Sequence, residues 1–120
     1  YNRSFEVGRL NELKRIHPDL GGALNAMIDR VVDLHPLTQQ YYCHPDMKGR
    51  YSLKAVLPTI APELAYDELE IGDGLVASGA WREIYHPDTA EDRRVQLYAA
   101  LAEYCERDTL ALVRLAAFLS

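Results

Sequence analysis

The carboxylate of Asp108 falls on an apolar stripe near the C-terminal end of the chain. The stripe recurs every three or four residues, the spacing that places side chains on one face of an α-helix. Its members are Leu97, Leu101, Tyr104, Asp108, Leu112, Leu115 and Leu119. An unpaired carboxylate on a buried face is unfavourable by several kcal/mol. Asp108 therefore requires a partner, which can be a basic residue, a set of hydrogen-bond donors or a metal ion.

A second acid, Glu6, shares a helical face with Leu10, Leu13 and His17 near the start of the chain. Each acid has a structural explanation of its own. The helix dipole favours a glutamate in a first turn, and Asp108 can accept a hydrogen bond from a tyrosine or pair with an arginine. Together the two acids also suit a metal site, so we predict that their carboxylates converge to within about 10 Å, the reach of a shared two-metal centre.

Helical periodicity and capping residues predict five or so helices around these acids. The predicted helices are residues 4–16, a second from 18 to about 31, a short one at 53–57 stopped by Pro58, 73–84, and about 90–120. The run 31–34 can alternatively form a short buried strand, because periodicity does not separate the two over so few residues. We expect residues 37–50 and 58–72 to be irregular and Trp81 to lie in the core.

Composition and charge narrow the classes of protein. The hydrophobic fraction of 48% is typical of a folded domain, and no apolar run approaches the roughly 20 residues that span a bilayer. The net charge of −5 argues against a simple nucleic-acid-binding module but is compatible with a metal-dependent nuclease, whose clustered carboxylates are neutralised by metal ions. Cys43 and Cys105 show no zinc-binding spacing. We expect reduced thiols and a cytoplasmic protein with no membrane partner.

Two short patterns at opposite ends of the chain carry a family resemblance. Tyr104 to Asp108 has the form Tyr-x-x-x-Asp, which resembles the third motif of the DEDDy branch of 3′–5′ exonucleases. Asn2 to Glu6 resembles the second motif of that branch, with Glu in place of the usual Asp. Tyr51 to Lys54 lies between them and matches a Tyr-Ser-Leu-Lys helix of the family. As a whole, the sequence resembles a bacterial domain family of unknown function with an RNase H-like fold.

This resemblance implies a fold, a reaction and a set of site residues. The fold would be α/β and RNase H-like, truncated at its N-terminus, so that the chain present is mostly α-helical with one or two short strands. The reaction would be hydrolysis of DNA or RNA by two Mg²⁺ or Mn²⁺ ions held about 4 Å apart. Glu6 and Asp108 would bind metal, and Tyr104 would orient the attacking water. Asn2 would hold the turn into the first helix at the substrate site, and Lys54 would contact phosphate.

The chain departs from the family in one respect, because no Asp-x-Glu motif precedes Asn2. We therefore expect residues 1–120 to be the C-terminal part of a single exonuclease domain, inactive alone and self-associating through the face that the missing strands would cover. Two alternatives stay open. The chain can be a helical interaction module, or an inactive nuclease-like domain that binds nucleic acid without cutting it.

Overall fold

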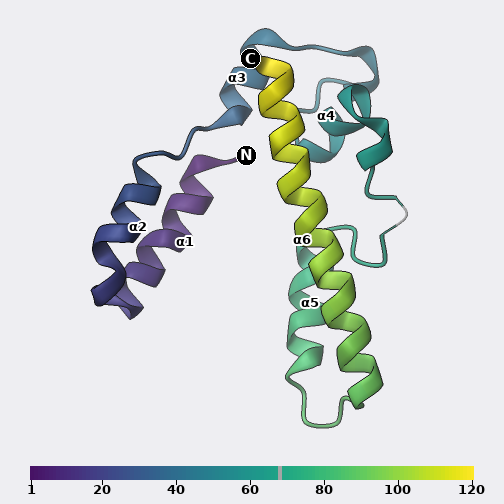
Figure 1. Cartoon of the computed structure of the whole chain (residues 1–120). Coiled ribbons are helices and arrows are strands. Elements are labelled where there is room, and N and C mark those ends of the chain that lie inside the picture. The colour runs from purple at the N-terminus through teal and green to yellow at the C-terminus, as the bar shows by residue number, and fades with distance from the viewer. Residues whose placement is uncertain (68) are drawn as a thin grey trace.

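The computed structural model describes residues 1–67 and 69–120, and every regular element in these ranges is a helix (Figure 1). The expectation of an α/β RNase H-like fold with one or two strands is therefore wrong for the described chain. Residues 31–33 form an extended connection in which the Val32 side chain is 67% exposed. A strand needs a neighbouring strand to satisfy its backbone groups, and no described segment offers one here.

The N-terminal part is a helical hairpin made of α1 (Arg3–Ile16), the short 3₁₀ turn η1 (Pro18–Leu20) and α2 (Gly21–Ile28). In Figure 1 its two helices lie side by side and project away from α6 (Glu91–Leu119). Leu24 is buried between them, whereas Leu13 is 45% exposed. The helical face that carries Glu6, Leu10 and Leu13 is thus not part of a core, because no residue of α1 is buried and a two-helix hairpin has too little cover for that face.

Asp33 joins the hairpin to the next helix, α3 (Leu34–Tyr41). Its carboxylate accepts hydrogen bonds from the backbone N–H groups of Arg3 and His35, both at 3.0 Å. Partial burial acts to raise the pKa of Asp33, but the two backbone donors outweigh it and hold the pKa below its ordinary value. One side chain therefore caps α1 and α3 together.

Two short helices and two 3₁₀ turns form a core with the C-terminal half of α6. Helices α3 (Leu34–Tyr41) and α4 (Leu53–Ile60) contact α6 directly, while η2 (Pro45–Met47) and η3 (Pro62–Leu64) pack on α4. The residues at the centre of this core are at most 1% exposed: Met47, Val56, Leu57, Ala111 and Leu115. Two expectations are corrected here. Residues 34–41 are helical rather than partly irregular, and Pro58 lies inside α4 instead of ending it.

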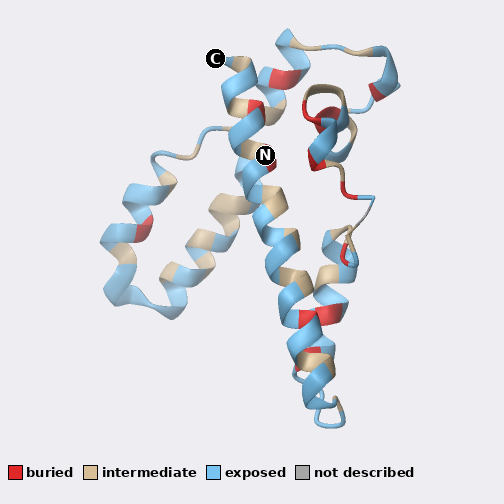
Figure 2. Ribbon diagram, turned by 45° about the vertical axis from the view of Figure 1, so that its right-hand side comes forward, coloured by how far each residue is buried: buried red, intermediate tan, exposed pale blue. Residues whose placement is uncertain are grey.

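A second hairpin holds the other core. Helix α5 (Gly74–Ile84) packs on the N-terminal half of α6 around Ile71, Ala80, Ile84 and Leu97 (Figure 2). Asp73 caps α5 by accepting hydrogen bonds from the backbone N–H groups of Leu75 and Val76, so the predicted start of this helix is confirmed. The long C-terminal helix is also confirmed. Trp81, expected in the core, is 52% exposed on the outer side of α5.

No helix in residues 1–67 or 69–120 combines the length and apolar character needed to span a bilayer. Cys43 and Cys105 are both free and exposed.

Candidate functional site

The buried face of α6 presents Asp108 to Tyr66, which follows η3. The Tyr66 hydroxyl donates a hydrogen bond of 2.5 Å to Asp108 Oδ1. Tyr66 is only 7% exposed, so the carboxylate meets its donor at the edge of the core. The partner that the apolar stripe requires for Asp108 is therefore a tyrosine hydroxyl.

Tyr104 lies one helical turn before Asp108 and completes this group of rings. Its ring centroid is 6.3 Å from that of Tyr66. Burial and the neighbouring charge of Asp108 raise the pKa of Tyr104 to about 12. The same two causes raise the pKa of Tyr66 above its ordinary range. Both phenols carry their protons at neutral pH, as tyrosines ordinarily do, so Tyr66 can donate to Asp108 and Tyr104 is a second donor beside the carboxylate.

Lys54 brings a positive charge to the group from α4. Its ammonium nitrogen lies 5.6 Å from the centroid of the Tyr66 ring, within the range of a cation–π contact. The pKa of Asp73, the residue that caps α5, is lowered chiefly by the hydrogen bond from the Val76 backbone, and the charge of Lys54 adds a smaller effect in the same direction. A Cβ built at Gly74 would lie 3.9 Å from the Tyr104 hydroxyl, which places the first turn of α5 against the same group.

Arg107 anchors the segment that carries Tyr66. Its guanidinium donates a 2.9 Å hydrogen bond to the carbonyl oxygen of Ala65. Because Ala65 directly precedes Tyr66, this bond fixes the backbone from which the ring extends toward α6. The positive charge of Arg107 also acts to lower the pKa of Tyr66, although burial and Asp108 prevail. We call the residues Lys54, Tyr66, Tyr104 and Asp108 the tyrosine–aspartate cluster.

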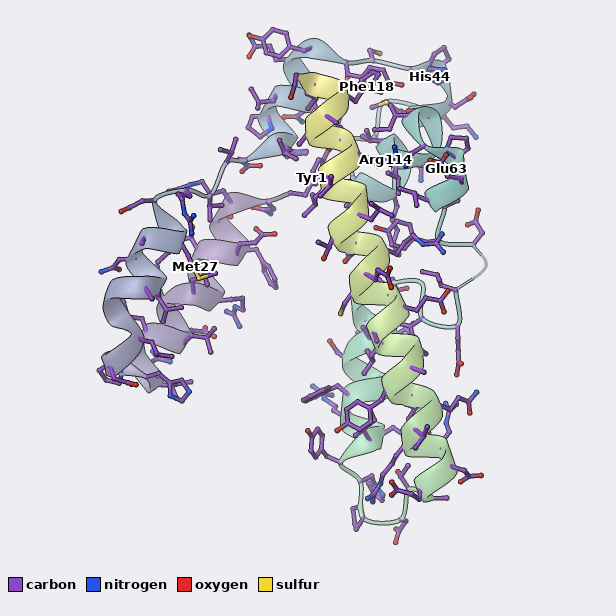
Figure 3. The ribbon with its side chains drawn as sticks, in the orientation of Figure 1. Tyr1, Met27, His44, Glu63, Arg114 and Phe118 are labelled. Atoms are coloured by element: carbon purple, nitrogen blue, oxygen red, sulfur yellow. The ribbon has the colours of Figure 1, made fainter. Side chains whose placement is uncertain are left out.

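Glu6 lies outside this cluster. Its Oε1 atom pairs with the amino group of Tyr1 at 3.3 Å, and its Oε2 atom is buried without a hydrogen-bond partner. Tyr1 itself packs on the core formed by Met47, Val56 and Leu115, and Figure 3 shows it beside α6 while Met27 lies far out on the hairpin. No contact in the described chain joins Glu6 to Asp108, and their sharing of a metal stays a prediction.

Asn2 has a local role. Its side-chain oxygen accepts a 2.7 Å hydrogen bond from the Ser4 hydroxyl, and it occupies the residue before α1 without a side-chain bond to the helix backbone. It therefore contacts the first turn of α1 through Ser4 rather than by capping the helix, and its role in a substrate site stays a prediction.

The cluster can supply one carboxylate ligand to a divalent ion. Mg²⁺ is often bound through one or two carboxylates together with substrate phosphates and water, so Asp108 fits part of such a donor set. Among the described residues, no three His, Cys, Asp or Glu side chains gather closely enough to bind a metal by themselves. Further oxygen ligands would have to come from substrate, from water or from protein beyond the cluster.

Tyr66 is the member of the cluster that the sequence did not single out. The position of Asp108 required a partner, and a tyrosine donor was one of the alternatives. The chain has eight tyrosines, however, and Tyr66 lies 42 residues before Asp108 in a segment without periodic pattern. The contact depends on the path of the chain after η3, which local spacing does not encode.

Residues 1–52 match the family model described as a domain of unknown function, DUF2779. The chain is also 29% identical over 136 residues to Uncharacterized protein UU173 of Ureaplasma parvum serovar 3 (strain ATCC 700970). That alignment covers 99% of the chain and 20% of the relative, so the chain spans about a fifth of that protein's length. No solved structure matches the chain.

Proposed function

We propose that the chain contributes the Tyr104–Asp108 part of a metal-dependent 3′–5′ exonuclease site that hydrolyses DNA or RNA. One observation carries the proposal. Lys54, Tyr104 and Asp108 are three of the five residues that the resemblance assigns to such a site, and they lie in one cluster although α4 and α6 are far apart in sequence. Spacing along the chain does not require Lys54 to lie there.

Each residue of the cluster has a defined task in this function. Divalent ions, when bound, would activate water and stabilise the leaving oxygen. Asp108 would hold one ion, and the hydrogen bond from Tyr66 fixes the rotation of its carboxylate. Tyr104, protonated at neutral pH, would donate a hydrogen bond to the attacking water or to a phosphate oxygen. Lys54 would contact the phosphate as a compact positive charge.

Two further contributions complete the proposal. Glu6 would become a ligand only if the α1–α2 hairpin brought it close to Asp108. The remaining acids would come from the rest of a longer protein, because the chain spans only a fifth of its relative. The chain alone is accordingly inactive in this proposal.

The test compares two variants of the complete gene product, each with one substitution on α6. A single-stranded oligonucleotide labelled at its 5′ end is incubated with Mn²⁺, and the release of 3′ nucleotides is followed. Asp108→Asn should lower the rate at least about a hundredfold, the upper end of what losing even an outer-shell partner costs a metal site. Glu103→Gln, an exposed change on the same helix, should leave the rate unaltered. Equal rates for wild type and Asp108→Asn would sink the proposal.

The isolated chain gives a second readout. With DNA or RNA and Mn²⁺ it should release no nucleotides above an Asp108→Ala control, because two of the four acids that such a site needs are absent. Cleavage that depends on Asp108 in the isolated chain would contradict the inactive state and support the site.

A non-catalytic helical binding module is the second candidate function. It is favoured by the Tyr66–Asp108 hydrogen bond, since this bond satisfies the carboxylate without a metal. In that case the complete protein would bind nucleic acid or a protein partner, and neither Mn²⁺ nor the Asp108→Asn change would affect the binding.

A further inference from the structure

Three aromatic rings gather on the exposed surface where α5 ends and α6 begins. Trp81, Tyr85 and Tyr98 are 52%, 64% and 46% exposed. The Trp81 ring centroid lies 5.0 Å from that of Tyr85 and 6.4 Å from that of Tyr98. The two tyrosine hydroxyls are 3.4 Å apart. Exposed aromatic rings that lie next to one another in this way are typical of a surface that binds a ligand or a partner.

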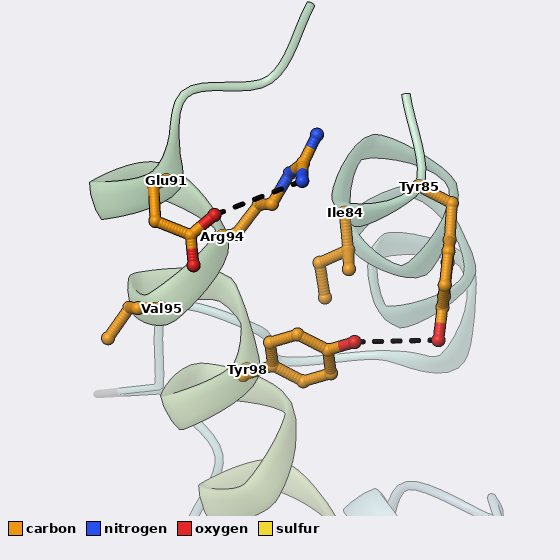
Figure 4. A pocket seen from close by; sticks show the side chains of 6 residues that line it. All are labelled: Ile84, Tyr85, Glu91, Arg94, Val95 and Tyr98. Carbon is orange, nitrogen blue, oxygen red and sulfur yellow. Dashed lines mark hydrogen bonds and ion pairs between the residues drawn. The ribbon is translucent and has the colours of Figure 1, made fainter. Parts of the chain in front are cut away.

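A pocket of about 290 Å³ opens between the two tyrosines, and Figure 4 shows it from close by. Its wall is lined by Ile84, Tyr85, Glu91, Arg94, Val95 and Tyr98. The Arg94 guanidinium crosses one end, where it donates a 3.2 Å hydrogen bond to the carbonyl oxygen of His86 and lies 3.9 Å from Glu91. The pocket thus combines ring faces with one donor group and one acceptor group.

We propose that this pocket receives an unpaired base of a single-stranded nucleic acid. The choice of nucleic acid rests on the proposed function. A base is a flat neutral ring that stacks on aromatic side chains and on the planar guanidinium of arginine. The charges of Arg94 and Glu91 balance each other, so the pocket suits a neutral ring better than a phosphate.

The polar groups of the pocket favour a nucleic-acid base over the aromatic side chain of a protein partner as its ligand. The edge of a base carries carbonyl and amino groups that can meet Arg94 and Glu91, whereas a phenylalanine ring carries none. The Nε atom of Arg94 is buried without a hydrogen-bond partner. If the guanidinium turns toward a bound base, this donor gains the acceptor that it now lacks.

The pocket also lies at a useful distance from the tyrosine–aspartate cluster. Tyr98 and Asp108 are ten residues apart on the same helix, a rise of about 15 Å. A strand with one base in the pocket could therefore follow the α5–α6 hairpin toward Asp108. Binding at the pocket would hold the strand a short way from the end that is cut.

The test uses Trp81, the single tryptophan of the chain, as its own reporter. Tryptophan fluorescence is recorded while oligothymidylate, oligouridylate or a DNA duplex is added to the protein without divalent metal. Each of the two single strands should quench the fluorescence in a saturable manner. Comparing the affinity for oligothymidylate with that for oligouridylate then shows whether the pocket prefers DNA or RNA. The duplex should not quench the fluorescence, because its bases are already stacked and paired.

Two matched variants locate the effect. Tyr98→Ala should weaken single-strand binding about tenfold, within the range measured for losing one stacked ring, whereas Tyr98→Phe should keep it. Tyr41→Ala removes a tyrosine that is 69% exposed on α3 and should change nothing. Far-ultraviolet circular dichroism checks that each variant is folded.

The possible outcomes separate this inference from the proposed exonuclease. An absence of saturable quenching, or equal affinity in Tyr98→Ala, would overturn the base pocket even if Asp108 proves essential for cleavage. Quenching that depends on protein concentration without oligonucleotide, and that Tyr98→Ala abolishes, would assign the pocket to a protein interface and overturn it too. Saturable, Tyr98-dependent quenching in the 120-residue chain, together with a complete protein that never cuts, would support the pocket and refute the exonuclease.

Discussion

At the scale of single residues, Asp108 shows that a carboxylate on an apolar helix face predicts a nearby bonding partner. A carboxylate on an apolar stripe required a partner, and Tyr66 supplies one at 2.5 Å. The hydrogen bond is charge-assisted and partly buried, and charge-assisted hydrogen bonds are stronger than neutral ones. It also crosses from the segment after η3 to α6, so it restrains the chain as well as the carboxylate.

The Tyr66→Phe variant tests the worth of this hydrogen bond. Phenylalanine keeps the ring and removes only the hydroxyl, which leaves Asp108 without this donor. The free energy of unfolding should fall by about 1.5–3 kcal/mol, the usual contribution of a hydrogen bond to a charged group. Urea denaturation measures it, with Tyr41→Phe as the exposed control. An unchanged denaturation midpoint would show that Asp108 finds an equally good donor elsewhere.

The raised pKa values of Tyr66 and Tyr104 predict a loss of stability in alkali. Burial and the Asp108 charge favour the protonated phenols in the folded state, so the unfolded chain, with ordinary tyrosine pKa values near 10, releases these protons first. The stabilisation is complete below pH 10 and is lost as the pH rises from about 10 through 12. Urea denaturation across this interval should show the fall, and it should be smaller in Tyr66→Phe. An equal fall in both proteins would assign it to other groups.

Sequence reasoning at this scale found most of the cluster but not its central contact. Tyr104 and Asp108 are neighbours on one helix, so their spacing alone places them together. Lys54 was selected by resemblance, and the structure places it over the Tyr66 ring. Glu6 was selected by its helical face, but that face lacks cover in the hairpin, and its convergence with Asp108 stays a prediction.

At the scale of elements, the chain encodes its long helices clearly and its short ones poorly. The apolar stripe of α6 recurs over about six turns, and Asp73 marks the start of α5 through an ordinary side-chain cap. Helix α3 is only eight residues long and contains Pro36, so its pattern is too short to recognise. It forms because Asp33 caps it and Thr38 is buried beneath it.

The α5–α6 packing can be tested at Leu97. This side chain is 2% exposed among Ile71, Ala80 and Ile84. Leu97→Ala should lower the free energy of unfolding by about 2–5 kcal/mol, through lost burial and the cavity that remains. Val95→Ala on the same helix is the control, because Val95 is 61% exposed and should cost little. Comparable losses in both variants, measured by urea denaturation, would mean that α5 does not cover Leu97 in solution.

The cap of α5 gives a pH-dependent prediction. Hydrogen bonds from the Val76 and Leu75 backbone outweigh the opposing effect of burial and lower the pKa of Asp73. Its stabilising effect is therefore present above the ordinary aspartate pKa and is lost as the pH falls through the lowered value. Asp73→Ala should reduce the thermal midpoint at neutral pH and flatten its dependence on acid, whereas Asp73→Asn should retain part of the cap. An Asp73→Ala protein with the wild-type acid profile would contradict this.

At the scale of the whole molecule, the fold is open. Its accessible surface is 8217 Å², against about 6,600 Å² for a compact monomer of this mass. The radius of gyration is 16.7 Å, where about 14 Å is usual for this length. The surplus surface includes Val113 and Phe118 on α6, which are 59% and 51% exposed. The sequence predicted a stripe on one side of α6 but not how little of the remaining helix surface would be covered.

This openness leads to the prediction of self-association. One apolar groove on α6 is lined by Cys105, Glu106, Thr109, Leu110 and Val113, outside both cores. A second copy of the chain can cover it at little cost, because the same surface is available on both partners. We expect light scattering at micromolar concentration to give the mass of a dimer or higher oligomer. Val113→Asp should shift the mass toward the monomer by burying a charge in the contact, whereas Val32→Asp, at an exposed site in the connection to α3, should not. A wild-type protein that stays monomeric under these conditions would show that α6 tolerates its exposed face in water.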